Sequence, residues 1–229
     1  MKVDLQDKPQ DFVDLYRRSN PLPGARAKVP LLHVVESEAG GSKPAESVLC
    51  ESLIVAEFVA ERFGGGGGQD GGSGLGGLLP PVLVDRARSR LFTELCGSAF
   101  SYFPLLRAKG DKLETSLETY KEGLIGVDAF LAEVGDDEGP FLLGRRFSLA
   151  ECSAAPFLQR ACTILPEFMG SGGRPVHPIE VCDELGLVRL RRWIEAVLER
   201  PSVESTGVPK DEMIRSTQKM LERFAAMEE

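Results

Sequence analysis

Histidine is scarce in this 229-residue chain, which holds only His33 and His177. Two histidines far apart in the sequence give little support to a metal site, so we expect none. The chain also has five cysteines, at Cys50, Cys96, Cys152, Cys162 and Cys182. Their number is odd and no two have C-x-x-C spacing, which favours free thiols in a reducing compartment over a disulfide framework. We therefore expect a cytoplasmic protein, although a lost N-terminus could have carried a transit peptide.

Basic residues are outnumbered by acidic ones, 27 to 35, which gives a net charge of -8 and an isoelectric point near 5.0. This balance argues against nucleic acid or an anionic membrane surface as the main partner, because proteins bind both through a positively charged surface. Apolar runs of about 18 residues are lacking, so we expect no membrane-spanning helix. Residues 1–20 are charged and mixed, unlike a signal peptide.

Glycine, by contrast, is concentrated in residues 64–80, which read GGGGGQDGGSGLGGLLP. Such a segment is typical of a flexible linker. A phosphate-binding loop is the alternative, but the lysine of the GxxxxGK[ST] motif is lacking and no strand and helix flank the segment. The linker divides the chain into residues 1–63 and residues 81–229.

The N-terminal part has a mixed pattern of strands and helices. Phe12, Val13, Leu15 and Tyr16 lie at near-helical spacing after Pro9, which suits a first helical turn. We expect a strand end at 3–5, a helix at 9–18, a strand at 29–35, a hairpin loop at 38–43, a strand at 47–49 and a helix at 51–63.

The C-terminal part has helical patterns only. Apolar residues from Leu113 to Val134 recur at steps of three and four, which predicts an amphipathic helix. The expected helices lie at 82–108, 112–134, 148–168, 180–199 and 210–227. Five helices without a strand pattern predict a helical bundle.

The helix expected at 148 begins with a capping box. Ser148 is a favourable N-cap, and Glu151 follows three residues later. Phe147 and Cys152 are placed to form a hydrophobic staple across the helix start. Together these contacts are worth about 1–2 kcal/mol to the helix, and we interpret them as a folding device.

Four motifs resemble those of the glutathione transferase superfamily when taken in order. Residues 7–12 (DKPQDF) resemble the segment after the second strand in the omega, lambda and dehydroascorbate-reductase branch. Lys28-Val29-Pro30 and Glu51-Ser52 resemble the superfamily's glutathione site. Residues 144–151 (GRRFSLAE) resemble the capping motif of its helical domain, which usually ends in Asp where this chain has Glu.

The resemblance implies a fold of two domains. Residues 1–63 would form an incomplete α+β thioredoxin-like domain that binds glutathione. Residues 64–80 would be a linker, and residues 81–229 would form the all-α transferase C-terminal domain.

The resemblance also implies which residues hold glutathione. The Val29 backbone would pair with the cysteinyl part of the tripeptide, and Pro30 would be cis. Glu51 and Ser52 would hold the γ-glutamyl end. There are alternatives for both residues. Pro30 could be an ordinary proline at the edge of a strand, and Glu51 could simply offset the positive end of the helix dipole.

Two lysines would face the opposite end of glutathione. By the resemblance, Lys8 would face the glycyl carboxylate and Lys28 would assist it. The two positively charged lysines would attract this negatively charged carboxylate. A solvated surface lysine is the alternative for Lys8.

A second pocket, for the co-substrate, would lie against the first long helix of the C-terminal part. The residues that cluster there are mostly expected in the core, with some lining the pocket. They are Phe92, Leu95, Cys96, Phe100, Tyr102 and Phe103.

No catalytic residue can be assigned. In the superfamily the nucleophile lies after the first strand, whereas this chain resembles the family from its second strand onward. There are three alternatives. The sequence is incomplete, or it is a short form that has lost catalysis but keeps a binding or structural role, or another residue has taken over as nucleophile. Cys50 is the best candidate for that last case, because it precedes a helix start; Tyr16 and Ser19 are weaker.

The implied activity is glutathione-dependent thiol transfer or reduction, with glutathione as co-substrate. The second substrate would be a small electrophile, an oxidised thiol or dehydroascorbate, and a homodimer is possible. The alternative is a non-catalytic glutathione-binding or scaffold protein with a transferase fold.

Overall fold

The computed structural model describes residues 3–4, 7–36, 45–63, 77–169 and 176–228. They belong to two compact units, Met1–Gly76 and Gly77–Glu229, called here the N-terminal unit and the C-terminal unit. Most of the expected linker and the whole expected hairpin loop at 38–43 lie outside the described residues.

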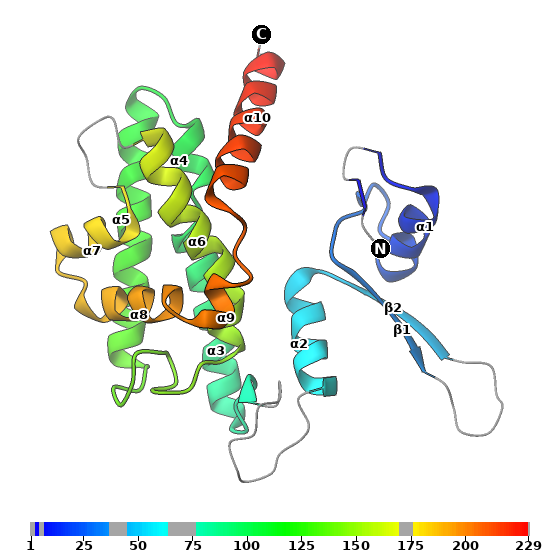
Figure 1. The fold of residues 1–229 in the computed structure, drawn as a ribbon, viewed down its shortest axis with the longest axis horizontal. Helices are drawn as coiled ribbons and strands as arrows, with labels where there is room; N and C mark the ends of the chain where they lie inside the picture. Colours follow the sequence, from blue (N-terminus) through cyan, green and yellow to red (C-terminus); the bar gives the residue numbers. More distant parts are fainter. Residues whose placement is uncertain (1–2, 5–6, 37–44, 64–76, 170–175, 229) are drawn as a thin grey trace. The chain divides into compact units, whose positions relative to one another are not determined.

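The N-terminal unit runs helix, strand, strand, helix (Figure 1). Its elements are α1 (Gln10–Ser19), β1 (Leu31–Glu36), β2 (Ala45–Cys50) and α2 (Ser52–Phe63). This mixed unit, followed by an all-helical one, confirms the predicted fold class. The strand end predicted at 3–5 is wrong for Val3 and Asp4, which are irregular, while Leu5 lies outside the described residues.

Helix α1 is attached to the hairpin by a narrow apolar stripe. Phe12 and Tyr16, one helical turn apart, are each only 2% exposed, and α1 packs against β2. Pro9 occupies the N-cap, where its missing N–H costs no helical hydrogen bond. The spacing of two aromatic residues thus explains both the helix and the face that it buries.

Strands β1 and β2 form an antiparallel pair in the part of the N-terminal unit that the structure describes. Their register runs from Leu31 opposite Cys50 to Glu36 opposite Ala45. In an antiparallel pair the beginning of one strand lies beside the end of the other. The residues before Leu31 and after Cys50 are therefore brought to the same end of the hairpin.

The C-terminal unit consists of helices α3 to α10 in its described residues (Figure 1). They are α3 (Leu83–Ala99), α4 (Phe103–Arg107), α5 (Asp111–Glu133), α6 (Leu149–Met169), α7 (Pro178–Leu185), α8 (Val188–Leu198), α9 (Pro201–Glu204) and α10 (Lys210–Glu228). The prediction of a helical bundle is confirmed.

Two of the predicted long helices are wrong, because each is two helices. The helix expected at 82–108 ends at Ala99 and resumes at Phe103, where Pro104 lies in the first turn of α4. Pro104 has no backbone N–H to donate to the carbonyl four residues earlier, that of Phe100, and a proline suits the first turn of a new helix. The helix expected at 180–199 is divided by Gly186, whose φ of 70° is the left-handed cap that ends α7.

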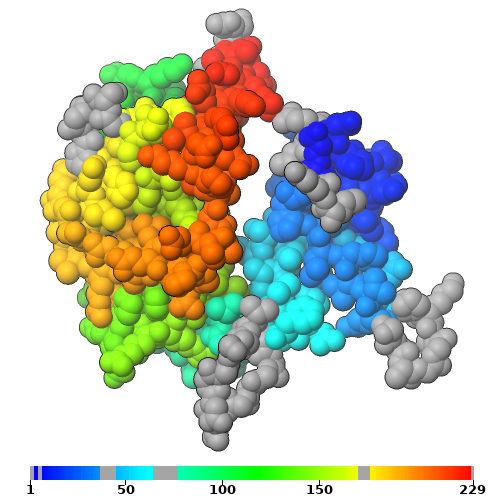
Figure 2. All heavy atoms as spheres, viewed as in Figure 1, coloured from blue at the N-terminus to red at the C-terminus, as the bar shows by residue number. Residues whose placement is uncertain are grey.

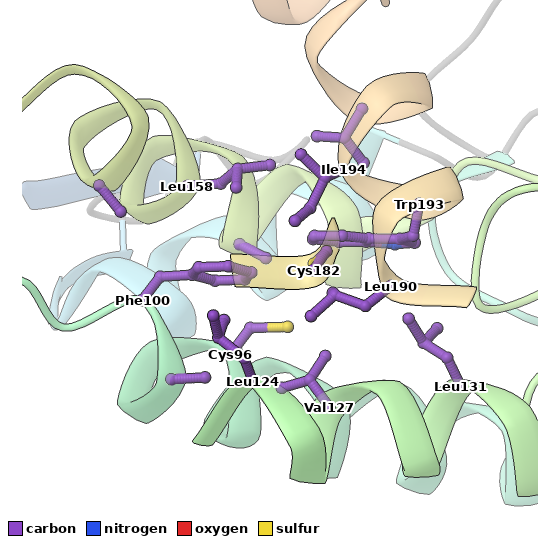
Figure 3. Packing of buried hydrophobic residues seen from close by; sticks show 14 of the residues in the cluster. Cys96, Phe100, Leu124, Val127, Leu131, Leu158, Cys182, Leu190, Trp193 and Ile194 are labelled. Atoms are coloured by element: carbon purple, nitrogen blue, oxygen red, sulfur yellow. The ribbon is translucent and has the colours of Figure 1, made fainter. Parts of the chain in front are cut away.

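The core of the C-terminal unit is centred on Trp193 of α8 (Figure 3). The rings of Phe92 and Trp193 meet edge to face, with centroids 5.3 Å apart. The Phe100 ring lies nearly parallel to that of Trp193, at 6.1 Å. Leu124 and Val127 supply the buried face of α5. These side chains show why α3, α5 and α8 pack together.

The predicted capping box is confirmed, and its carboxylate does more than cap. Glu151 is fully buried and accepts hydrogen bonds from the backbone N–H of Ser148 at 2.9 Å and from its hydroxyl at 2.6 Å. The Leu142 N–H donates to the same carboxylate at 3.0 Å, and Trp193 Nε1 donates at 3.2 Å. Glu151 thus connects the start of α6 to a loop and to the central tryptophan.

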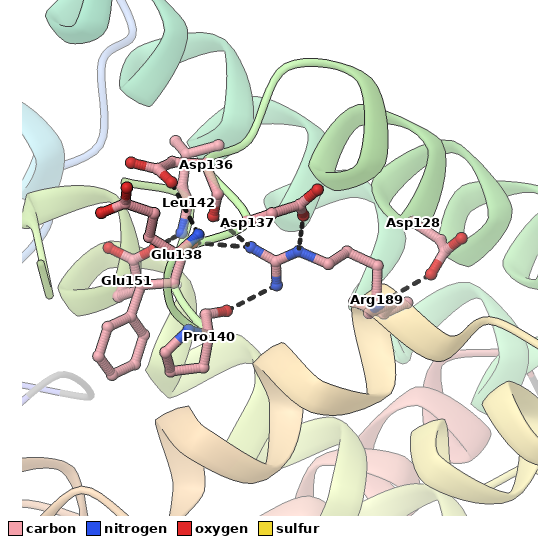
Figure 4. Close-up of polar contacts among 10 residues, drawn as sticks. Asp128, Asp136, Asp137, Glu138, Pro140, Leu142, Glu151 and Arg189 are labelled. Atoms are coloured by element: carbon pink, nitrogen blue, oxygen red, sulfur yellow. Dashed lines mark hydrogen bonds and ion pairs between the residues drawn. The ribbon is translucent and has the colours of Figure 1, made fainter. Parts of the chain in front are cut away.

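Arg189 holds the loop that leads into α6 (Figure 4). Its guanidinium donates to the carbonyl oxygens of Pro140 at 2.7 Å and Phe141 at 2.8 Å. Burial lowers the pKa of Arg189, with a further lowering from Arg192. The neighbouring Leu190 N–H donates to Asp128 Oδ1 of α5 at 2.8 Å. Loop, α8 and α5 are thereby fixed to one another.

The C-terminal helix packs on the outside of this unit. Helix α10 packs against α6, and Figure 2 shows α9 and the first turns of α10, in orange, at the surface. Phe224 of α10 meets Phe103 of α4 edge to face, with ring centroids 5.5 Å apart. Arg107 lies 4.8 Å from the Phe224 ring centroid, a cation–π distance.

Candidate functional site

The candidate glutathione site lies at one end of the hairpin in the N-terminal unit. Val29 and Pro30 directly precede β1, and Glu51 and Ser52 directly follow β2. Because Leu31 pairs with Cys50, the two dipeptides leave the sheet side by side. The Val29–Pro30 peptide bond is cis, as the resemblance implies. Val29-Pro30 and Glu51-Ser52, about twenty residues apart in the sequence, therefore lie at the same end of the hairpin.

Glu51 has an unusual backbone conformation at this end. Its φ is 70°, and among the described residues it is the one non-glycine with positive φ. A side chain in this region costs of order 1–3 kcal/mol, and such residues cluster at ligand sites. The Glu51 carbonyl accepts the first helical hydrogen bond, from Val55 N at 2.9 Å. Its carboxylate and the Ser52 hydroxyl are exposed.

The free N–H groups of α2 add to this arrangement. The first turn of a helix leaves its N–H groups without helical partners, and they favour negative charge. No acidic residue occupies the first turn of α2. A carboxylate brought to this end of the hairpin would thus meet N–H donors and the Ser52 hydroxyl.

The two predicted lysines are placed differently. Lys28 is exposed and immediately precedes Val29, so it adjoins the hairpin end. Lys8 is half-buried and precedes Pro9, the N-cap of α1. The strand register does not reach Lys8; its place relative to the hairpin is set by the packing of α1 on β2.

The candidate nucleophiles of the N-terminal unit are Cys50, Tyr16 and Ser19, and each is paired or hydrogen-bonded with a neighbouring residue. Cys50 is half-buried at the end of β2, opposite Leu31. The Tyr16 ring is buried, and its hydroxyl accepts from Asn20 Nδ2 at 3.3 Å. The Ser19 hydroxyl donates to the Tyr16 carbonyl at 2.9 Å. Both hydroxyls are therefore engaged within α1 and its C-terminal end.

The thiols of the C-terminal unit are poor nucleophiles. Burial raises the pKa of Cys152 to about 11 and the pKa of both Cys162 and Cys182 to about 12. The pKa of Cys96 is also raised, first by burial and then by Glu151. A thiol attacks as the thiolate, which these environments disfavour at neutral pH.

The aromatic cluster predicted to line a second pocket belongs mainly to the core. Phe92, Cys96 and Phe100 are completely buried, while Leu95 and Tyr102 pack against the same core. The structure instead has a groove between α6, α9 and the start of α10. Sequence patterns missed it, since its walls come from three separate segments.

The described residues hold neither a cluster suited to a metal ion nor a helix suited to crossing a bilayer. No group of three or more histidine, cysteine or acidic side chains is arranged there to hold a metal ion. None of the described helices combines the length and apolar character that a bilayer crossing requires.

Comparison with known proteins finds a family match within the C-terminal unit. Residues 111–196 match the family described as glutathione S-transferase, C-terminal domain. This range begins at α5 and ends within α8. It includes the capping box at Ser148 and Glu151 and the central Trp193.

Comparison of the whole chain finds the following similar proteins. Glutathione transferase Omega 1C from Trametes versicolor is 28% identical, with a TM-score of 0.61 over 94% of this chain and 82% of that one. A glutathione transferase from Burkholderia graminis, solved with two glutathione molecules bound per subunit, is 17% identical, with a TM-score of 0.52 over 86% of this chain and 70% of that one. The stringent starvation protein A homolog of Haemophilus influenzae is 26% identical over 183 residues, which are 76% of this chain and 68% of that protein.

Proposed function

Because residues 111–196 match the glutathione S-transferase C-terminal domain family, we propose that this chain is a glutathione transferase-like protein that binds glutathione at the hairpin end of its N-terminal unit. The observation that carries the proposal is the strand register. Leu31 opposite Cys50 brings Val29-Pro30 and Glu51-Ser52 to one place. The likeness to an omega-class transferase at 28% identity supports the same ligand.

Each part of glutathione has a partner of matching chemistry in this proposal. The Val29 backbone pairs with the cysteinyl part. The γ-glutamyl end carries both an amine and a carboxylate, which suit the Glu51 carboxylate and the Ser52 hydroxyl with the N–H groups of α2. Lys28 and Lys8 attract the glycyl carboxylate.

The proposed reaction is glutathione-dependent thiol transfer or reduction. Two glutathione molecules are oxidised to glutathione disulfide as one disulfide substrate, or one dehydroascorbate, is reduced. The residues named above account for the binding of glutathione. No residue is assigned as the thiolate that attacks the second substrate. A small electrophile is the other class of second substrate.

Isothermal titration of the full chain with reduced glutathione tests the proposal. Ser52→Ala and Glu51→Gln should each weaken binding by about tenfold, equivalent to about 1.4 kcal/mol, because each removes a charged or hydrogen-bonding partner. Ser47→Ala and Glu36→Gln are matched controls on exposed strand positions and should bind as the wild type does. Wild-type protein that fails to bind at millimolar glutathione would refute the proposal.

A second candidate is glutathione binding without turnover, and the thiols favour it. All four thiols of the C-terminal unit have raised pKa values. An assay with hydroxyethyl disulfide and glutathione separates the candidates. Turnover that Cys50→Ser abolishes would assign the enzyme activity to Cys50, whereas binding with no turnover would support a binding or scaffold role.

We also propose a cytoplasmic location and a homodimer for this chain. All five cysteines are free, which suits a reducing compartment. The homodimer rests on the family resemblance, and sedimentation equilibrium measures it directly.

A further inference from the structure

Strand β1 of the N-terminal unit has one edge paired with β2 and a second edge that pairs with no strand among the described residues. Figure 1 draws the hairpin as two strands. An unpaired strand edge presents a row of backbone N–H and C=O groups, which makes it a template for another strand. A two-stranded sheet also gains stability when further strands join it. The free edge of β1 is therefore a surface on which a strand can be added.

The side chains of β1 suit a protein neighbour better than water. The strand reads LLHVVE, and its apolar residues lie on both faces because successive side chains alternate. None of them is buried, and Val35 has 56% of its surface accessible. Natural edge strands are commonly protected by a lysine or a proline, and Leu31–Glu36 contains neither.

A second copy of β1 can pair with this edge in few symmetric registers. N–H and C=O groups point to alternate edges along a strand, so residues that pair across the free edge are separated by an even number of positions. A symmetric antiparallel pair therefore has one residue opposite its own copy. Centring on Leu32 brings Pro30, which has no N–H, into the ladder. Centring on Val34 places Leu32 opposite the Glu36 carboxylate.

The register centred on His33 avoids both defects. It places Leu31 opposite Val35 of the second copy, and Leu32 opposite Val34 of the second copy. Each apolar side chain then lies beside another apolar side chain on the same face of the sheet, which is the arrangement that stabilises strand pairs. Both faces of the joined sheet are thus apolar along its centre.

Charges at the two ends of this register are also complementary. Glu36 of one copy comes beside Pro30 of the other, two residues from the exposed Lys28. The two-fold symmetry repeats this meeting of opposite charges at the other end. The ladder from Leu31 to Val35 leaves out the Val29 backbone, so it does not use the group that is proposed to pair with glutathione.

We propose that two copies of this chain associate through the free edges of their β1 strands, forming one continuous sheet in the order β2-β1-β1-β2 with His33 at its centre. Backbone hydrogen bonds supply the affinity, and the apolar pairs fix the register. The inference rests on the homodimer proposed above and adds the surface that forms it. It is independent of glutathione binding.

Sedimentation equilibrium of the full chain tests the surface. Val35→Lys places a charge at an exposed edge position, opposite Leu31 of the second copy, and should raise the dimer dissociation constant at least about tenfold. Ser47→Lys is the matched control, because it adds the same charge to an exposed position of β2, the other strand of the hairpin. It should leave the dissociation constant unchanged.

Cysteine cross-linking tests the register. Only the central residue faces its own copy, with Cα atoms about 4.5–5.5 Å apart, a separation that a disulfide spans. Under mild oxidation, His33→Cys should give a disulfide between the two copies at position 33, identified by peptide mass spectrometry. Val34→Cys should give none, because its two copies would lie roughly 8 Å apart.

The outcomes separate this surface from the earlier proposals. A dimer that Val35→Lys leaves intact, or that Ser47→Lys weakens instead, would overturn the surface while retaining the homodimer. A wild-type chain that stays monomeric throughout the run would overturn both. Glutathione affinity of Val35→Lys should equal that of the wild type, so loss of the dimer is not mistaken for loss of the glutathione site.

Discussion

At the scale of single residues, one buried carboxylate organises the C-terminal unit. Glu151 accepts four hydrogen bonds, from Ser148 (twice), Leu142 and Trp193. The sequence predicts one of them, from the Ser148 backbone N–H, because a capping box is a local motif. The bond from Trp193 joins residues 42 positions apart, so only the folded structure reveals it.

Replacing this carboxylate should therefore cost more than losing a helix cap. Glu151→Gln presents an amide N–H₂ toward a cluster of donors, and the free energy of unfolding should fall by about 2–4 kcal/mol. Glu151→Asp keeps the charge and should cost less, about 1–2 kcal/mol. Urea denaturation measures both, with the exposed Glu118→Gln on α5 as control. Equal stability of Glu151→Gln and that control would contradict this role.

His177 makes the stability depend on pH. Its Nδ1 accepts the Ile179 N–H at 3.2 Å as the N-cap of α7. Burial lowers the pKa of His177 below its usual range, against a smaller opposing effect of Glu180. In the unfolded chain the imidazole binds its proton near pH ~6.5, so protonation favours unfolding, and stability should fall as the pH drops through that value.

The variant His177→Asn isolates this contribution. Asparagine keeps a capping oxygen but does not titrate. Between about pH 8 and pH 5, wild-type protein should lose more unfolding free energy than the variant does. Identical pH profiles would show that His177 contributes nothing to the dependence.

At the scale of elements, helical periodicity predicts where helices exist better than where they end. The patterns at 112–134 and 148–168 correspond to α5 and α6 within a few residues. Those at 82–108 and 180–199 continue across real breaks, because apolar spacing persists through Phe100 and Leu187, which are both buried. Pro104 and Gly186 set the breaks. Both are local signals in the sequence, but the prediction of one long helix in each place followed the apolar spacing instead.

Two glycines should respond to alanine in opposite directions. Gly186 has a φ of 70° with open space around it, so an added Cβ meets backbone strain but no clash. Gly186→Ala should cost about 1 kcal/mol. Gly126 lies exposed inside α5, also in open space, and Gly126→Ala should add about 0.5–1 kcal/mol. Thermal unfolding of both variants checks the signs, and a shared sign would contradict the account.

At the scale of the whole molecule, the order of motifs predicts the fold and part of the site. Val29-Pro30 and Glu51-Ser52 are visible as dipeptides, and the antiparallel register explains why they meet. The conformation of Glu51 and the position of Lys8 require the structure. The groove between α6, α9 and the start of α10 could not be predicted, because α6 and residues 202–213 are separated by about forty residues.

The central claim is that glutathione binds at the hairpin end of the N-terminal unit. The most direct measurement is a backbone amide NMR titration of the full chain with reduced glutathione. The account predicts saturable shifts concentrated at the amides of Val29, Leu31 and 50–54. Saturable shifts confined to the C-terminal unit, or none at millimolar glutathione, would contradict it.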